Sequence, residues 1–193
     1  MIIFFTFIEI FNPYFSANFL APDEYTDDYF SHIYQFSFGN DFYSKDIGWG
    51  IYFDYFYKRD YPYSDQFFIK SGLPFGINAR GGGFQLKYLG FGDIEVGVKL
   101  GYYAGEITYP VPGDSGRIIE EIDSRNSIGL CMGVNLLHNF SFIYGGLRFW
   151  VNLISFDAER PPYFWYHPRS PDYISLNTAG FGIILGLGKR QKK

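Results

Sequence analysis

The sequence predicts an all-β fold: an antiparallel up-and-down transmembrane β-barrel of about eight strands, with long outer loops and short periplasmic turns. Three observations favour this fold class. Apolar residues alternate with small or polar residues along seven segments, with the period of two that strands require. Short connections between these segments alternate with long ones. Aromatic residues make up 23% of the chain and there are 23 glycines, a mixture that suits strands better than helices.

The first eleven residues, Met1–Phe11, are strongly apolar and allow two interpretations. They could form a secretory signal with cleavage near Ala17 or Ala21, although no Lys or Arg precedes the apolar run and Glu9 interrupts it. They could instead contain a first strand over 3–11. The following residues, 12–29, include two prolines and four acidic residues, and we expect a loop there.

The remaining strands follow in order. We expect them at 30–39, 47–58, 82–89, 93–104, 127–137, 141–153 and 173–188. The short connections are 40–46, 90–93 and 138–140, and the long ones are 59–80, 105–126 and 154–172. With a strand at 3–11 the count is eight and both termini lie on the side of the short turns, as in bacterial outer-membrane barrels. The domain boundaries are therefore an N-terminal segment at 1–29, a barrel domain at 30–188 and a basic tail at 189–193.

The segment Asp93–Ala104 shows the two faces most clearly. One face is apolar and ends in a tyrosine and an alanine: Ile94, Val96, Val98, Leu100, Tyr102 and Ala104. The opposite face carries Glu95, Gly97, Lys99, Gly101 and Tyr103. In a soluble sheet the apolar face would pack on a core, whereas in a membrane barrel it would face lipid.

The distribution of residues over the faces favours the membrane barrel. Aromatic residues gather toward strand ends, as in the interfacial girdles of membrane proteins: Trp49, Tyr55, Tyr57 and Tyr102. An eight-stranded barrel has room inside only for side chains. We therefore predict a closed lumen with a salt-bridged network of inward charges: Asp54, Lys87, Glu95, Lys99 and Arg148. A selectivity ring is the alternative role for these charges.

Composition excludes several classes of protein. The net charge of −4 gives no electrostatic case for nucleic acid. No window holds the eighteen or more apolar residues of a transmembrane helix, so a polytopic helical membrane protein is excluded. Cys131 is the sole cysteine and we interpret it as a small packed residue.

The strand pair 82–104 with its Gly-Phe-Gly-Asp turn, and the terminal run Ala-Gly-Phe-Gly-Ile-Ile-Leu-Gly-Leu-Gly, resemble small Gram-negative outer-membrane β-barrel proteins of the OmpA/OmpX type. The resemblance is one of pattern over most of the chain, without a sharp motif. It implies insertion in the bacterial outer membrane and contact with outer-membrane lipid. One departure is the end of the chain, where such barrels usually have an aromatic residue and this one has Lys192-Lys193.

No catalytic, cofactor or metal site is predicted. Some outer-membrane barrels are enzymes with a His and a Ser on one face, but His138 and Ser141 are three residues apart and fall on opposite faces of a strand. His32 and His167 lie near strand or loop ends, and three scattered histidines form no metal cluster. The acidic run 23–28 lacks the ligand spacing of a calcium loop.

An aromatic cluster in the last long connection is the predicted contact surface: Tyr163, Phe164, Trp165 and Tyr166. It would contact lipopolysaccharide or a protein partner, or pack over the barrel mouth as a lid. Three hypotheses for function follow. The leading one is a non-enzymatic outer-membrane barrel with a structural or surface-interaction role. The others are a narrow pore for small solutes and a soluble lipocalin-like barrel with inverted faces that binds an apolar ligand.

Overall fold

The computed structural model of the protein describes residues 12–22, 32–60, 75–112, 118–157 and 173–188. Nearly all of these residues lie in strands. The strands are β1 (Asn12–Pro22), β2 (Ile33–Ser44), β3 (Ile47–Asp60), β4 (Phe75–Phe91), β5 (Ile94–Pro112), β6 (Ile118–Phe140), β7 (Ile143–Asp157), β8 (Tyr173–Ser175) and β9 (Thr178–Leu187). No helix within these ranges is long and apolar enough to cross a membrane.

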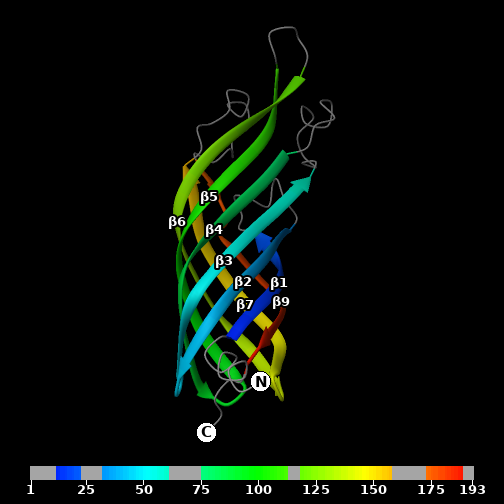
Figure 1. The fold of residues 1–193 in the computed structure, drawn as a ribbon. Helices are drawn as coiled ribbons and strands as arrows, with labels where there is room; N and C mark the ends of the chain where they lie inside the picture. The colour runs from blue at the N-terminus through cyan, green and yellow to red at the C-terminus, as the bar shows by residue number, and fades with distance from the viewer. Residues whose placement is uncertain (1–11, 23–31, 61–74, 113–117, 158–172, 189–193) are drawn as a thin grey trace, which may run out of the picture.

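The strands form a closed antiparallel barrel whose strands are tilted around a common axis (Figure 1). Each long strand from β1 to β7 pairs with the next, and β9 pairs with both β7 and β1, which closes the ring. The three-residue β8 pairs with the end of β7. Of the nine strands, all except β8 form the closed ring, which therefore has eight strands. This confirms the predicted fold class.

Three tight turns join strands at one end of the barrel. They are Lys45–Asp46, Gly92–Asp93 and Ser141–Phe142, and their first residues have φ angles of 55°, 71° and 59°. A positive φ at this position gives the backbone twist that matches two-residue hairpins. The turn predicted at 138–140 is wrong, because β6 continues to Phe140 and pairs there with Ile143.

The first strand of the barrel is not where the sequence predicted it. The loop predicted at 12–29 is wrong for 12–22, which forms β1 and pairs with both β2 and β9. Asn12, Ser16 and Asn18 face inward and are buried, while Phe19 faces outward. The alternation is present, but alanines replace large apolar residues on the outer face and weaken its signal. The strand predicted at 3–11 lies outside the described residues.

The connection predicted at 105–126 is also mostly wrong. β5 and β6 remain paired as far as Pro112 and Ile118, so this hairpin is longer than its neighbours (Figure 1). Outside the apolar belt, outward residues no longer need to be apolar, and the period-two signal fades although the strands continue. For the same reason β4 begins at Phe75, inside the connection predicted at 59–80.

The outer face of the barrel is an apolar belt between two aromatic rims. The belt includes the exposed side chains of Ile51, Phe53, Phe84, Leu86, Val98, Leu100, Met132, Leu147, Phe149, Phe181 and Ile183. The rim near the tight turns includes Trp49, Tyr88, Phe140 and Phe142, and the far rim includes Tyr34, Tyr57 and Tyr102. The nine residues from Trp49 to Tyr57 span about 26 Å of strand, or roughly 20 Å along the barrel axis at a tilt of about 40°. This height is close to the ~25 Å apolar band of outer-membrane barrels.

The inverted arrangement of faces does not occur. Ile94, Val96, Val98 and Leu100 are exposed on the outside, whereas Glu95 and Lys99 are fully buried inside. A lipocalin-like barrel would need the opposite placement, so that alternative is wrong.

Candidate functional site

The lumen of the barrel is lined by polar and charged side chains from every long strand. The side chains of all five residues in the predicted network lie inside and are nearly inaccessible: Asp54, Lys87, Glu95, Lys99 and Arg148. A sixth charged residue, Asp41 of β2, is also fully buried. These six residues form two groups of contacts at different heights.

The first group lies near the tight turns and is organised around the ammonium of Lys87. Lys87 Nζ is 2.6 Å from Asp41 Oδ2 and 3.4 Å from Glu95 Oε1. It also lies 4.4 Å from the centre of the Tyr14 ring. One buried cation therefore sits between two carboxylates from β2 and β5 and above an aromatic face, an arrangement that offsets its loss of hydration.

Hydrogen bonds extend this first group around the barrel wall. Gln85 Nε2 donates to Asp41 Oδ1 at 2.6 Å and Asn135 Nδ2 donates to Glu95 Oε1 at 2.6 Å. Trp150 Nε1 in turn donates to Asn135 Oδ1 at 3.0 Å. The contacts cross from β2 through β4, β5 and β6 to β7, so this network ties together five of the eight strands.

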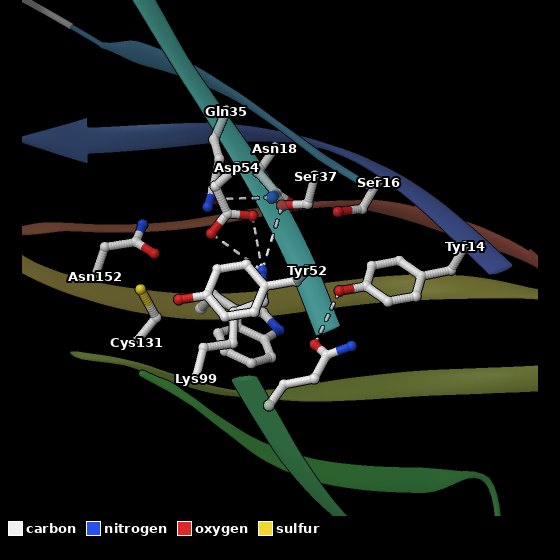
Figure 2. A network of polar contacts seen from close by, with 12 residues as sticks. Tyr14, Ser16, Asn18, Gln35, Ser37, Tyr52, Asp54, Lys99, Cys131 and Asn152 are labelled. Carbon is white, nitrogen blue, oxygen red and sulfur yellow. Dashed lines mark hydrogen bonds and ion pairs between the residues drawn. The ribbon is translucent and has the colours of Figure 1, made fainter. Parts of the chain in front are cut away.

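The second group lies at the middle of the barrel and is organised around Lys99. Figure 2 shows Lys99 and Asp54 directed toward one another across the lumen, with Lys99 Nζ 2.8 and 3.1 Å from the two Asp54 oxygens. Tyr103 donates its hydroxyl to Asp54 Oδ2 at 3.2 Å. Lys99 also lies 4.3 Å from the centre of the Tyr52 ring. Both partners of the ion pair are fully buried.

Arg148 lies on β7, on the opposite side of the ring from Asp54 of β3. Its Nη1 donates to Ser16 Oγ at 2.9 Å, and its guanidinium carbon lies 4.2 Å from the Trp150 ring. The Trp150 ring thus lies close to two cations, because Lys99 Nζ is also 5.2 Å from its centre. Cation–π contacts of this kind are stronger in a desolvated site than at a surface.

The charges in the two groups balance. Asp41, Asp54 and Glu95 give three negative charges, and Lys87, Lys99 and Arg148 give three positive charges. The five residues found from the sequence alone sum to +1, so Asp41 supplies the neutralising charge. It was missed because 40–46 was interpreted as a connection. Extending the alternation Gln35, Ser37, Gly39 by one more step would have placed Asp41 on the inner face.

The end of the lumen away from the tight turns is filled by apolar side chains. This outer apolar layer consists of Leu20, Ile33, Phe56, Ile77, Ile107, Ile154, Phe156 and Leu176, each at most 1% exposed. Beyond it, Lys58 Nζ contacts His32 Nε2 at 3.0 Å near the rim. In the part of the chain that the structure describes, this apolar layer lies between the two groups of buried charges and the rim at this end of the barrel.

Large rings fit in this narrow lumen because glycines face them from neighbouring strands. A Cβ atom at Gly129 would lie 2.6 Å from the Tyr103 ring, and one at Gly133 would lie 2.6 Å from the Trp150 ring. A Cβ at Gly105 would lie 2.9 Å from the Phe156 ring. These separations are shorter than real Cβ contacts, so the rings occupy space that only glycine leaves open.

The histidines that the structure describes do not contribute to the network of charges in the lumen. His138 is exposed near the end of β6, with its Nδ1 3.9 Å from Asp93 Oδ2, and His32 contacts Tyr34 and Lys58. Across the described ranges, no group of three or more His, Cys, Asp or Glu side chains is placed to hold a metal ion. The aromatic cluster Tyr163, Phe164, Trp165 and Tyr166, together with His167, lies outside the described residues.

Solved structures of bacterial outer-membrane proteins are similar to this fold. Neisserial surface protein A matches over 93% of this chain and 97% of its own, with 7% identity and a TM-score of 0.54. Ail of Yersinia pestis matches over 92% and 99% with 10% identity and a TM-score of 0.48, and the N-terminal barrel of Pseudomonas aeruginosa OprF over 91% and 96% with 12% identity and a TM-score of 0.43. No protein-family model and no curated sequence matches this chain. The first likeness establishes that the chain has the fold of small eight-stranded outer-membrane barrels.

Proposed function

We propose that this protein is an integral outer-membrane β-barrel with a structural or surface-interaction role and without enzymatic activity. The observation that carries the proposal is the distribution of side chains over the barrel wall. The outer face is an apolar belt bounded by aromatic rims, while six charged residues are buried in the lumen, where Lys87 and Lys99 are paired with carboxylates. Such a surface is unfavourable in water, because exposed apolar patches of this extent promote association. It is favourable in lipid, where the closed ring of eight strands pairs the backbone groups of neighbouring strands.

The polar lumen supports a structural role for the network. Its two groups of contacts link strands that are far apart in sequence, such as Asp41 with Lys87 and Asp54 with Lys99. Buried ion pairs are weak evidence for stability, but in some proteins buried polar groups specify register. We propose that the network maintains the closure of the barrel, and that contacts with lipopolysaccharide or a protein partner are made through the end that carries the long connections.

Insertion into lipid is the first property to test. We expect the chain to fold to a β-rich form only when detergent or liposomes are present, and to migrate on a gel at different positions with and without boiling. Circular dichroism and the gel shift provide the two readouts. A chain that is folded and monomeric in plain buffer would contradict the proposal.

The narrow-pore alternative is tested by conductance. We expect no steady ion conductance in planar bilayers, because the outer apolar layer lies between the buried charges of the lumen and the rim. A porin of known conductance in the same bilayer is the control. Reproducible single-channel steps from the purified protein would replace the structural role by a transport role.

A further inference from the structure

Among the residues that the structure describes, the hairpin of β5 and β6 has an unpaired edge above the barrel. These two strands pair as far as Pro112 and Ile118. On the other side of β6, pairing with β7 reaches only Gly129 and Ile154. Residues 118–128 of β6 therefore have β5 on one side and, among the residues the structure describes, no strand on the other. Figure 1 shows this hairpin rising beyond the ends of the other strands.

The backbone groups along this edge point outward at every second residue. The amide of Leu137 donates to the carbonyl of Asp93 at 2.7 Å, so odd-numbered residues of β6 direct their N–H groups toward β5. The β5–β6 register continues to the tip without a shift. Because the direction alternates along an antiparallel ladder, Ile122, Ser124 and Asn126 direct their N–H groups toward the free edge.

The composition of this edge favours strand addition. The segment Ile118–Ile128 contains four isoleucines and no proline, glycine or lysine. Its side chains at Ile122, Ser124, Asn126 and Ile128 are exposed, with Ile122 at 61% and Ile128 at 73%. Natural proteins usually protect exposed edges with prolines, lysines or bulges. This edge has no proline, lysine or bulge, and its four isoleucines favour the extended conformation.

We propose that the free edge of β6 over residues 118–128 binds an extended, basic segment of a partner protein by adding it as a further strand. The proposal rests on the proposed function, since it requires that this end of the barrel faces away from the membrane. Main-chain hydrogen bonds would provide affinity, as in other cases of strand addition. The sign of the partner's charge follows from the segment itself, whose sequence has three acidic residues and one basic residue, Arg125.

A second copy of the chain fits this edge less well. Two barrels in one membrane project their hairpins in the same direction, so their β6 edges would meet in parallel with equivalent residues near one another. Like charges in such positions are destabilising. A segment that alternates basic residues with residues of high β-propensity avoids this repulsion and keeps the backbone pairing.

The test uses the full chain in lipid nanodiscs and a short fluorescent peptide in which lysine and threonine alternate. Fluorescence anisotropy should show saturable binding of this peptide. A peptide with glutamate in place of lysine should not bind, and one with its lysines in a single block should bind more weakly. Binding of the alternating and block peptides with equal affinity would reduce the interaction to non-specific charge attraction and overturn the proposal.

Two double variants separate the backbone from the side chains. Ser124→Pro with Asn126→Pro removes two edge N–H groups that the β5 pairing does not use, and should weaken binding about tenfold or more. Ser124→Ala with Asn126→Ala keeps both N–H groups and should bind as the wild type does. Equal binding by the proline variant would show that the edge is not the site.

Hydrogen exchange and the gel shift on boiling separate failure of strand addition from failure of membrane insertion. Hydrogen exchange on the wild-type protein should slow at the amides of Ile122, Ser124 and Asn126 when the peptide binds, but hardly change at Arg125, whose N–H faces β5. This measurement decides the question even if the proline variant does not fold. If the gel shift on boiling is absent, the proposal that the protein is a membrane barrel fails. If the barrel inserts but shows neither peptide binding nor amide protection, only the proposal of strand addition at residues 118–128 is overturned.

Discussion

Replacing Asp54 with alanine is expected to lower the free energy of unfolding by about 3–5 kcal/mol, the largest effect of any lumen substitution. The change leaves the Lys99 ammonium without the carboxylate 2.8 Å away, in a position that is fully buried. It also removes one of the hydrogen-bond partners of the Tyr103 hydroxyl. Urea unfolding of the protein in lipid vesicles, followed by tryptophan fluorescence, measures the difference.

Two control variants show whether the ion pair or the loss of volume is responsible. The double variant Asp54→Leu with Lys99→Met removes both charges and should recover most of the lost stability, because a buried pair replaced by apolar residues is often neutral. Asp93→Ala removes an aspartate that is about half exposed at a turn, and should change the free energy of unfolding by less than about 0.5 kcal/mol. A loss below about 1 kcal/mol for Asp54→Ala would contradict the role assigned to the pair.

An arginine in place of Val98 is expected to lower the free energy of unfolding in lipid by about 2–4 kcal/mol. Val98 is 44% exposed on the outer face of β5, between the two aromatic rims. If this face contacts lipid, the guanidinium must be accommodated in the hydrocarbon region. If the face contacted water, the same substitution at an exposed position would have little effect. The result therefore distinguishes a membrane barrel from a soluble one.

The matched control lies on the same strand and the same face. Ile94→Arg places the identical side chain beside the tight turn Gly92–Asp93, where the cost in an outer-membrane barrel falls to about 0–1 kcal/mol. Unfolding by urea in vesicles is measured for both variants. Equal effects at Val98 and Ile94 would contradict the depth dependence and with it the lipid-facing belt.

The sequence predicted the faces of the strands and so the content of the lumen. Along β5, alternation alone separates Val98 and Leu100 from Glu95 and Lys99, because successive side chains of a strand must point to opposite faces. The same reasoning places Arg148 and Lys87 inside. It did not find Asp41, because the polar residues near the β2 turn resemble a connection.

Strand ends were predicted less well than strand faces. β1 was interpreted as a loop because Ala17 and Ala21 give little contrast with the polar inner residues. The outer halves of β5 and β6 were interpreted as a connection because a strand beyond the membrane belt has no reason to alternate. In each case the tertiary pairing with neighbouring strands maintains an extended conformation that local composition does not indicate.

What the sequence by itself determined is therefore the barrel class, the two faces of each central strand and most of the charges inside. A period of two decides which side of the wall a residue faces, and it requires no knowledge of other strands. Only the tertiary structure decided that Lys87 lies between Asp41 and Glu95, that Lys99 pairs with Asp54, and that residues 118–128 of β6 form an edge. These features depend on register, and on where each pairing ends. Register is set by contacts between strands, and the pairs Asp41–Lys87 and Asp54–Lys99 join residues more than forty positions apart, which no local pattern contains.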